Sequence, residues 1–303
     1  MKIFIVGGSG YLGRNLVQSL SDVGHEVISV SRNPFEWGLH LNIHSVNSNF
    51  ANFDFDHIEI QGSVLIFLAT PMLSREYLPP PVTDQYLRDL RNFYLKCIKY
   101  GVERFIYSSS GGSVYGENYI HNKKWKETDL LNPVSQYGIL KKRSEEMLLG
   151  IENKDLVLVI VRIANPFGYI SEVKKGNRLF LEYLQNSSQT NSPITLFNEG
   201  SLVRDYFPMK ELVSMVHLLI EGSPSYSVYN LGSGQGISMR EILRILESAK
   251  DTSLNYANKE KPIDEPLINI LDMSRFTSEF SWKPTLNIRK ELSLFFEDQK
   301  FNN

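Results

Sequence analysis

Unbroken apolar runs alternate with apolar stripes of helical spacing along the first half of the chain. The runs are Lys2–Val6, Glu26–Val30, Val64–Ala69 and Arg104–Ser108. Such runs are typical of strands that are buried on both faces of a sheet. Between them, apolar residues recur every three or four positions, as at Leu12, Leu16 and Leu20, which predicts amphipathic helices. Alternating strands and helices predict a parallel sheet whose ligands gather at the strands' carboxyl ends.

The remaining patterns extend this picture less evenly. Further strands are predicted at Val157–Val161 and Val228–Leu231, and a helix at Lys210–Gly222. Residues 33–62 have poor periodicity and receive no element. The segment Thr70–Pro81 ends in three prolines and is interpreted as a break,. The polar tract Gln185–Pro193 is expected to be a loop.

Composition changes the picture mainly by exclusion. The chain has 303 residues, of which 42% are hydrophobic and 22% charged, enough for two lobes and a substantial core,. A net charge of -2 with scattered lysines and arginines gives no reason to expect nucleic acid or a membrane as partner,. The single Cys97 falls on an apolar helical face and is expected to be a buried hydrophobe. The N-terminal strand resembles no signal peptide, so a cytoplasmic protein is expected.

A glycine-rich turn follows the first predicted strand. Gly7, Gly10 and Gly13 are spaced G-x-x-G-x-x-G and lead into the first helix. Backbone amides at a helix N-terminus bind pyrophosphate, so this setting predicts a dinucleotide. The second strand ends at Ser31-Arg32, without the acidic residue that holds a ribose 2′-hydroxyl. This favours NADP weakly over NAD.

The strongest chemical pattern is Tyr137-x-x-x-Lys141. On a helix these two side chains share a face, which places the lysine beneath the tyrosine ring. A tyrosine base near neutral pH needs a pKa about three units below its usual value of about 10. A lysine ammonium together with a cationic nicotinamide is the kind of environment that lowers it.

These motifs together resemble the extended short-chain dehydrogenase/reductases, and within them the nucleotide-sugar epimerases, dehydratases and 4-keto reductases. The resemblance spans nearly the whole chain. It rests on the glycine turn, the tyrosine–lysine pair and three further segments, 108–116, 162–168 and 203–207. It implies a Rossmann-type doubly wound parallel sheet with a smaller α/β C-terminal lobe for the substrate.

The resemblance also implies roles for particular residues. Tyr137 is the acid/base and Lys141 orients the nicotinamide ribose. The residue whose hydroxyl binds the reacting sugar oxygen is expected to be Ser110, with Ser113 in reserve, because Gly111 occupies the usual position. Absence of a carboxylate in Gly111-Gly112-Ser113 disfavours a 4,6-dehydratase. The full set of expected cofactor contacts is Gly7, Gly10, Tyr11, Leu12, Gly13, Ser31, Arg32, Ala69, Tyr137 and Lys141.

Candidate substrate contacts lie mostly in the second half. A guanidinium can hold a diphosphate bidentately, and the family motif gives Arg204 this role. Asp205 is expected to anchor the local loop. Asn165 is a candidate contact for the sugar or diphosphate, and the rival interpretation is a residue that forms a turn. Phe197 is a candidate contact for the nucleotide base, and the rival interpretation is core packing. Lys261 and Asp264 fall where relatives often place an Arg and an Asp on the nucleotide. Together with Ser110 and Ser113, the expected substrate contacts are therefore Asn165, Phe197, Arg204 and Asp264.

The resemblance implies a division into a cofactor domain at residues 1–166, with 203–234 returning to it, and a substrate lobe at 167–202 and 235–303. The function it favours is an NAD(P)-dependent 4-epimerase of nucleotide sugars for cell-surface polysaccharide precursors. The first alternative is an NADPH-dependent reductase of a nucleotide-linked 4-keto-6-deoxyhexose. The second is a non-catalytic dinucleotide-binding sensor. Relatives often dimerise through two helices that include the Tyr137 helix, so a homodimer is expected.

Overall fold

The computed structural model describes the chain except for residues 39, 74–75, 119, 121–122, 170–179 and 298–303. Its centre is a parallel sheet of seven strands in the order β10-β6-β5-β4-β1-β2-β3. The apolar runs predicted a parallel sheet, and the family resemblance implied this Rossmann-type arrangement. The strands are β1 (Lys2–Val6), β2 (Glu26–Ser31), β3 (Ile43–Asn47), β4 (Val64–Phe67), β5 (Arg104–Ser110), β6 (Val157–Ile163) and β10 (Val228–Leu231).

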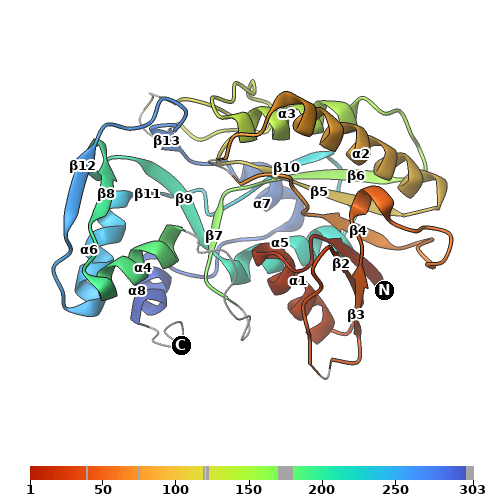
Figure 1. Cartoon of the computed structure of the whole chain (residues 1–303), viewed down its shortest axis with the longest axis horizontal. Coiled ribbons are helices and arrows are strands. Elements are labelled where there is room, and N and C mark those ends of the chain that lie inside the picture. The colour runs from red at the N-terminus through yellow and green to blue at the C-terminus, as the bar shows by residue number, and fades with distance from the viewer. Residues whose placement is uncertain (39, 74–75, 119, 121–122, 170–179, 298–303) are drawn as a thin grey trace.

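Two helical layers cover the large sheet, one on each face (Figure 1). One layer consists of α1 (Tyr11–Asp22) and α5 (Met209–Glu221), whose apolar sides share a core with the sheet. The other consists of α2 (Pro80–Lys99) and α3 (Gln136–Leu149), which share a second core with the opposite face. Cys97 is fully buried in that second core, as expected. The short helix η1 (Phe50–Asn52) packs on α2.

Three expectations about local structure were incomplete or wrong. The prolines interpreted as a break begin α2: Pro79 is its N-cap, and Pro80 and Pro81 form its first turn. A proline is tolerated there because the N–H it lacks has no partner within the helix. The tract Gln185–Pro193 is not a loop in its first part, which belongs to α4 (Phe180–Thr190). The unassigned residues 33–62 contain the edge strand β3.

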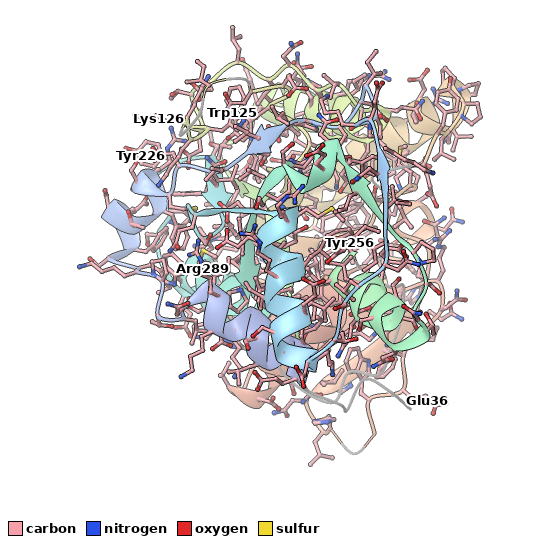
Figure 2. All side chains as sticks on the ribbon, turned by 90° about the vertical axis from the view of Figure 1, so that its left-hand side faces the viewer. Glu36, Trp125, Lys126, Tyr226, Tyr256 and Arg289 are labelled. Carbon is pink, nitrogen blue, oxygen red and sulfur yellow. The ribbon has the colours of Figure 1, made fainter. Side chains whose placement is uncertain are left out.

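A smaller lobe lies beside the carboxyl edge of the large sheet. It contains β7 (Asn165–Phe167), β8 (Ile194–Phe197), β9 (Val203–Pro208), β11 (Gly236–Ser238), β12 (Tyr256–Lys259) and β13 (Ile268–Asn269), with η2 (Asn198–Gly200). Its helices are α4, α6 (Met239–Lys250) and α8 (Ile288–Glu297), which bury a third core. Figure 2 faces this lobe, with Arg289 of α8 and Tyr256 of β12 on either side of α6.

The chain crosses between the lobes several times. Strand β9 lies in a four-stranded sheet with β7, β11 and β13, whereas β10 and α5 belong to the large sheet and its layer. The helix α7 (Ser274–Phe280) packs against β10. The domain boundaries given above therefore stay a prediction. No helix among the described residues is long and apolar enough to cross a bilayer.

Candidate active site

A large cavity opens where the carboxyl ends of the parallel strands meet the smaller lobe. Its volume is about 1930 Å³. Every residue predicted as a cofactor or substrate contact lines it, from Gly7 in the first turn to Asp264 near the end of the chain. Loops at the carboxyl edge of a parallel sheet form the usual ligand site of such folds. The structure thus brings the predicted set together, while the role of each residue remains a prediction.

The glycine turn lies at one end of this cavity. Gly7 has φ +90°, a conformation that side chains other than glycine rarely adopt,. A Cβ on Gly13 would lie 2.3 Å from the carbonyl oxygen of Gly7, so only glycine lets α1 approach the turn this closely. Gly10 is the N-cap of α1 and offers no side-chain cap. The first amides of α1 are therefore free to bind an anion, which fits the pyrophosphate of a dinucleotide.

The neighbouring predicted cofactor residues lie along the same end. Ser31 is buried at the end of β2, and Arg32 after it is exposed at the cavity rim. The hydroxyl of Tyr11 donates a hydrogen bond of 2.9 Å to the carbonyl of Gly168. Tyr11 therefore ties the glycine turn to the segment that follows β7. Leu12 and Ala69 line the cavity as predicted.

Tyr137 and Ser110 both line the cavity. The Ser110 side chain acts to lower the pKa of Tyr137, and the Ser110 hydroxyl donates a hydrogen bond of 3.2 Å to Ser113. A side chain at position 111 would be tightly confined, because a Cβ on Gly111 would lie 2.6 Å from a methyl group of Leu271 and 3.0 Å from the carbonyl oxygen of Arg162. Packing thus favours glycine at this position, and the role of the Ser110 hydroxyl stays a prediction.

Lys141 lies one helical turn below Tyr137, as the spacing predicted. Its Nζ is 5.7 Å from the centre of the Tyr137 ring and donates a hydrogen bond of 2.6 Å to the carbonyl of Ser108. Burial lowers the pKa of Lys141 to about 7, against a smaller raising effect of the Glu145 carboxylate. Burial also raises the pKa of Tyr137 to about 12, and the Ser110 side chain offsets this only in part.

These two pKa values describe the Tyr137–Lys141 pair in the protein alone. The lysine together with a cationic nicotinamide was expected to lower the tyrosine pKa, and that expectation stays a prediction, since burial raises the pKa of Tyr137 in the protein alone. Desolvation disfavours the charged form of both groups, so it raises the tyrosine and lowers the lysine.

A buried ion pair between Glu145 and Arg162 supports α3, the helix that carries Tyr137 and Lys141. Glu145, one turn after Lys141, is 1% exposed and lies 2.7 Å from Nη2 of the buried Arg162 on β6. Its carboxylate also accepts a hydrogen bond from Ser109 on β5. Arg162 Nη1 in turn donates to the hydroxyl of Tyr115 at 3.0 Å. The pair therefore fixes α3 to the two central strands beneath the site.

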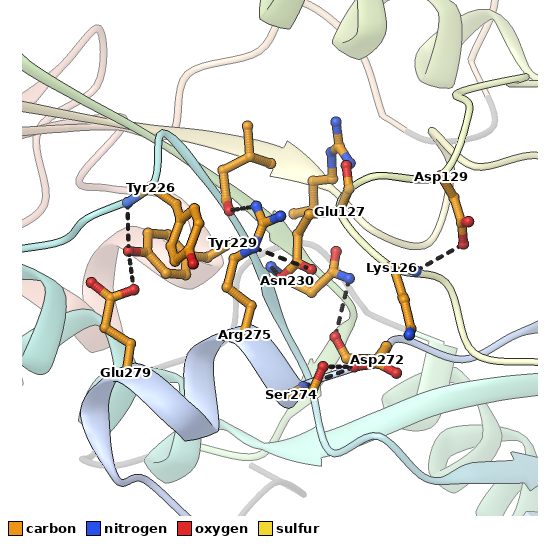
Figure 3. Close-up of polar contacts among 12 residues, drawn as sticks. Lys126, Glu127, Asp129, Tyr226, Tyr229, Asn230, Asp272, Ser274, Arg275 and Glu279 are labelled. Atoms are coloured by element: carbon orange, nitrogen blue, oxygen red, sulfur yellow. Dashed lines mark hydrogen bonds and ion pairs between the residues drawn. The ribbon is translucent and has the colours of Figure 1, made fainter.

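The same polar network continues to the outer strand of the sheet. The Tyr115 hydroxyl donates to Asn230 at 2.6 Å. Figure 3 shows Asn230 between Glu127 and Asp272: its backbone N–H donates to the Glu127 carboxylate at 2.9 Å, and its amide donates to the Asp272 carbonyl at 3.2 Å. Arg275 of α7 lies 3.7 Å from the same Glu127 carboxylate. Polar groups this deeply buried require partners, and these contacts supply them.

Asp205 anchors a loop, as predicted, beside the predicted substrate residue Asn165. Its buried carboxylate accepts hydrogen bonds from the backbone N–H groups of Ser233, Gly234 and Leu271. Burial raises the pKa of Asp205 to about 6. The amide of Asn165 donates to the Asp205 carbonyl at 3.0 Å, while Asn165 itself lines the cavity.

Arg204 lines the cavity but is already engaged by protein groups. Its Nη2 lies 2.5 Å from the Glu265 carboxylate and donates at 2.6 Å to the carbonyl of Pro266. A second basic residue of this region, Lys261, forms an ion pair of 3.0 Å with Glu117 and is not among the lining residues. A diphosphate would have to compete with Glu265 for the guanidinium of Arg204.

Phe197 and Asp264 line the cavity from the smaller lobe and the segment after β12. Phe197 ends β8 and is half-buried, so part of its ring faces the cavity. Asp264 is exposed at the rim.

Sequence reasoning missed several residues that position the site. Gly138 follows Tyr137, and a Cβ there would lie 2.3 Å from the carbonyl oxygen of Ser113. The side chain of Gln136 makes two hydrogen bonds to the backbone of Leu78, at 2.7 and 2.6 Å. The glycine inside a helix was a usable signal, because glycine there is unfavourable unless close packing requires it. The partners of Gln136 and Glu145 are distant in sequence and gave no signal.

Comparison with known proteins agrees with this geometry. The model of the NAD dependent epimerase/dehydratase family matches residues 3–232. The chain is 24% identical to the dTDP-4-dehydro-6-deoxyglucose reductase of Escherichia coli, over 94% of this chain and 93% of the relative. A crystal structure of the Thermotoga maritima UDP-glucose 4-epimerase with UDP-glucose superposes with a TM-score of 0.82 at 25% identity, covering 98% of both chains. The UDP-glucuronic acid 4-epimerase of Bacillus cereus, in complex with UDP-glucuronic acid and NAD, gives a TM-score of 0.85 at 20% identity, with 98% of both chains covered. The match over more than half of the chain establishes that this protein belongs to the NAD dependent epimerase/dehydratase family.

Proposed function

We propose that the protein is a UDP-sugar 4-epimerase that acts at C4 of the hexose. The observation that carries the proposal is that Tyr137 and Ser110 line the same cavity as the glycine turn and Arg204. A volume of 1930 Å³ is about twice the upper end of the roughly 300–1,000 Å³ typical of a single small-ligand pocket,. This supports a cofactor and a nucleotide sugar bound together.

The fit of the cofactor rests on the glycine turn. The amides at the start of α1 would hold the pyrophosphate of NAD, and Lys141 would contact its nicotinamide ribose. The nicotinamide, when bound, supplies a hydride acceptor at C4 and a positive charge. In the relative from Bacillus cereus, NAD is bound together with UDP-glucuronic acid.

The residues of the chain handle the proton at the C4 oxygen. Tyr137, as phenolate, accepts the proton of the 4-hydroxyl group and later returns it. The Ser110 hydroxyl holds the sugar O4 next to the phenol oxygen of Tyr137. Because the pKa of Tyr137 is about 12 in the protein alone, phenolate near pH 7 requires about five units of lowering, or about 7 kcal/mol. Lys141 and the further positive charge at the site act in that direction. At the other end, Arg204 would bind the diphosphate and Phe197 the base.

Two measurements test the proposal. Mass spectrometry under native and denaturing conditions should show NAD that remains bound through purification, since an epimerase regenerates its cofactor in each turnover. Incubation with UDP-glucose or UDP-N-acetylglucosamine should yield the 4-epimer.

Tyr137→Phe should lower kcat by about 10²–10⁴ without loss of NAD. The same change at Tyr226, which is exposed and lies outside the cavity, should leave kcat unchanged. Equal kcat in both variants contradicts the assignment of Tyr137.

A reductase of a nucleotide-linked 4-keto-6-deoxyhexose is the second candidate. It is favoured by the 24% identity to the Escherichia coli reductase and by the exposed Arg32 at the cavity rim, where a 2′-phosphate would lie. The neutral Tyr137 phenol is the form that donates a proton to a new alkoxide. An empty protein that oxidises NADPH with a dTDP-4-keto-6-deoxy sugar, and does not epimerise UDP-sugars, would select this candidate. Failure of both reactions would leave the non-catalytic sensor.

We also propose that the protein forms a homodimer through α2 and α3. The two helices pack together on one face of the sheet, linked by an ion pair of 2.8 Å between Asp84 and Arg143. Val82 and Ile139 on these helices are 42% and 44% exposed. Sedimentation equilibrium should show a dimer, and Ile139→Glu should convert it to a monomer. A monomeric wild type contradicts the proposal.

A further inference from the structure

Two histidines and a glutamate meet at the amino-terminal edge of the large sheet. His25 lies between the turn at Gly24 and the start of β2, whereas His217 and Glu221 lie four residues apart on α5. One ligand atom from each of the three side chains lies within 4.8 Å of the others. None of the three lines the cavity described above. The active site is at the carboxyl edge of the same strands, so this cluster needs an explanation of its own.

The geometry points to a binding site for a first-row divalent metal ion, and we propose Zn²⁺ as the ion that it binds. Two imidazoles and a carboxylate are a ligand set that Zn²⁺ takes, with bonds of about 2.0–2.2 Å. Two ligand atoms of a tetrahedral Zn²⁺ site are then about 3.3 Å apart. Nε2 of His217 lies 3.2 Å from one oxygen of the Glu221 carboxylate, and Nε2 of His25 lies 3.9 Å from the other oxygen. One ligand atom from each residue lies within 4.8 Å of the other two, so shifts of about 1–2 Å bring the three to bonding geometry,.

The buried histidine provides independent support. His25 is 7% exposed, and its Nε2 has no hydrogen-bond partner. This nitrogen is directed toward Glu221, while Nδ1 on the other side of the ring lies 3.5 Å from the Met1 amine. A buried polar atom without a partner costs free energy, and a metal ion would satisfy it.

An ordinary ion pair explains only part of the arrangement. His217 and Glu221 have the i,i+4 spacing of a common helical pair,. That pair gives no reason for a second imidazole ring 5.6 Å from the first. It also places a carboxylate on the last residue of α5, where the helix dipole disfavours negative charge,. A bound cation would offset that charge and join the end of α5 to the start of β2.

The exposure of the three side chains allows an ion to enter. The Glu221 side chain is 53% exposed and that of His217 is 30% exposed, so a fourth position is open to water. The site is distant from Tyr137 and from the cofactor turn, and we assign the ion a structural role. It would hold α5 on the sheet and would not take part in the reaction.

The test uses the full chain without a tag, because a polyhistidine tag binds the same ions. The protein is treated with a chelator, dialysed, supplied with one equivalent of Zn²⁺ and passed over a desalting column before elemental analysis. We expect about one Zn²⁺ per chain, a higher melting temperature with Zn²⁺, and at least tenfold weaker binding in His217→Gln and in Glu221→Gln. The matched control is His57→Gln. This change removes another histidine that is paired with a carboxylate, Asp54 at 2.7 Å, and whose side chain is 83% exposed. It should bind Zn²⁺ like the wild type.

Substitution of Zn²⁺ by Co²⁺ gives a readout that does not depend on the variants. A four-coordinate site with nitrogen and oxygen ligands gives visible absorption bands that are much more intense than those of aqueous Co²⁺. Such bands in the wild type and in His57→Gln, and their loss in His217→Gln, would support the site. No Zn²⁺ retained by the wild type, or equal binding in the wild type, His217→Gln and His57→Gln, would overturn it. Epimerase activity is expected to persist after chelation, so these outcomes are independent of the function proposed above.

Discussion

The buried pair of Glu145 and Arg162 offers the sharpest test of how the fold supports the site. The proposed change is Glu145→Gln, which preserves shape but removes the negative charge. Both side chains are almost fully buried, at 1% and 4% exposure. In the wild type, Arg162 donates to the carboxylate through Nη2 at 2.7 Å and through Nε at 3.1 Å. The variant leaves a guanidinium in the core with only neutral acceptors.

The expected loss follows from the asymmetry of buried pairs. Breaking such a pair by neutralising one partner costs about 3–5 kcal/mol, because the other charge remains desolvated. Gln keeps one oxygen as an acceptor for Arg162, so we expect a loss near 3 kcal/mol. A domain has a total stability of about 5–15 kcal/mol, so this loss is a large share. At about 2 °C per kcal/mol for a chain of this length, the melting temperature should fall by about 6 °C.

Chemical denaturation in urea with circular dichroism measures the effect, and the neighbouring residue provides the control. Glu146 is exposed and pairs with Lys142 at 3.8 Å across one helical turn. Glu146→Gln should therefore cost less than about 1 kcal/mol. Losses of equal size in the two variants would refute the reasoning, since they would mean that the Glu145 carboxylate is not desolvated in the folded protein.

The same substitution should also change the titration of Lys141. The Glu145 carboxylate acts to raise the pKa of Lys141, against the larger lowering effect of burial. Without that carboxylate the pKa of Lys141 falls further below about 7, so the ammonium is lost at lower pH. If Lys141 must be charged for turnover, the alkaline limb of kcat/KM should move to lower pH in Glu145→Gln and stay in place in Glu146→Gln. A shift toward higher pH would contradict this electrostatic link.

Three further substitutions test single contacts. Gly13→Ala places a Cβ 2.3 Å from the Gly7 carbonyl oxygen. The free energy of unfolding should therefore fall by about 1–3 kcal/mol, and calorimetry should show weaker NAD binding. Unchanged NAD affinity would contradict the close approach of α1 to the glycine turn. Glu265→Gln removes the carboxylate 2.5 Å from Arg204, and the affinity for UDP should rise about two- to fivefold by calorimetry, whereas a decrease would mean that Glu265 supports the nucleotide site. For Asp205, burial raises the pKa to about 6. The folded state therefore binds more protons than the unfolded state between pH of about 4 and 6. The free energy of unfolding of the wild type should fall as the pH rises through that range, and the same measurement on Asp205→Asn should lack this slope.

The sequence pattern predicted the central sheet well because its strands are buried on both faces. β1, β4 and β6 each contain an unbroken run of at least four apolar residues, which is typical of strands buried on both faces,. The edge strand β3 was missed because most of its residues are exposed, which leaves no apolar run. Residues 185–190 were expected to be a loop from their polar composition, but they continue α4 beyond the buried Leu181 and Leu184. There, packing against the third core outweighs local preference,.

The members of the site were predictable for a different reason. The glycine turn and the tyrosine–lysine pair are local patterns, and the parallel fold brings their segments to one edge of the sheet without further information. The partners of those residues depend on contacts between distant segments. Arg204 meets Glu265, which is 61 residues away, and Glu145 meets Arg162 on another element. No spacing rule connects such residues.

The charge states at the centre of the site were least accessible to sequence reasoning. A lysine four residues after a tyrosine suggests mutual electrostatic support, yet both groups lie in a poorly solvated region and each is shifted toward its neutral form. Burial is a property of the whole fold, so its magnitude cannot be estimated from two residues. Under the proposed function the consequence for mechanism is specific: the protein supplies the position of Tyr137 and Ser110 and the nearby Lys141, and the phenolate needed for epimerisation also depends on positive charge that arrives with the ligands. A protein with an empty site should therefore show a neutral Tyr137 phenol at pH 7, and only the loaded enzyme should be able to ionise it near neutral pH.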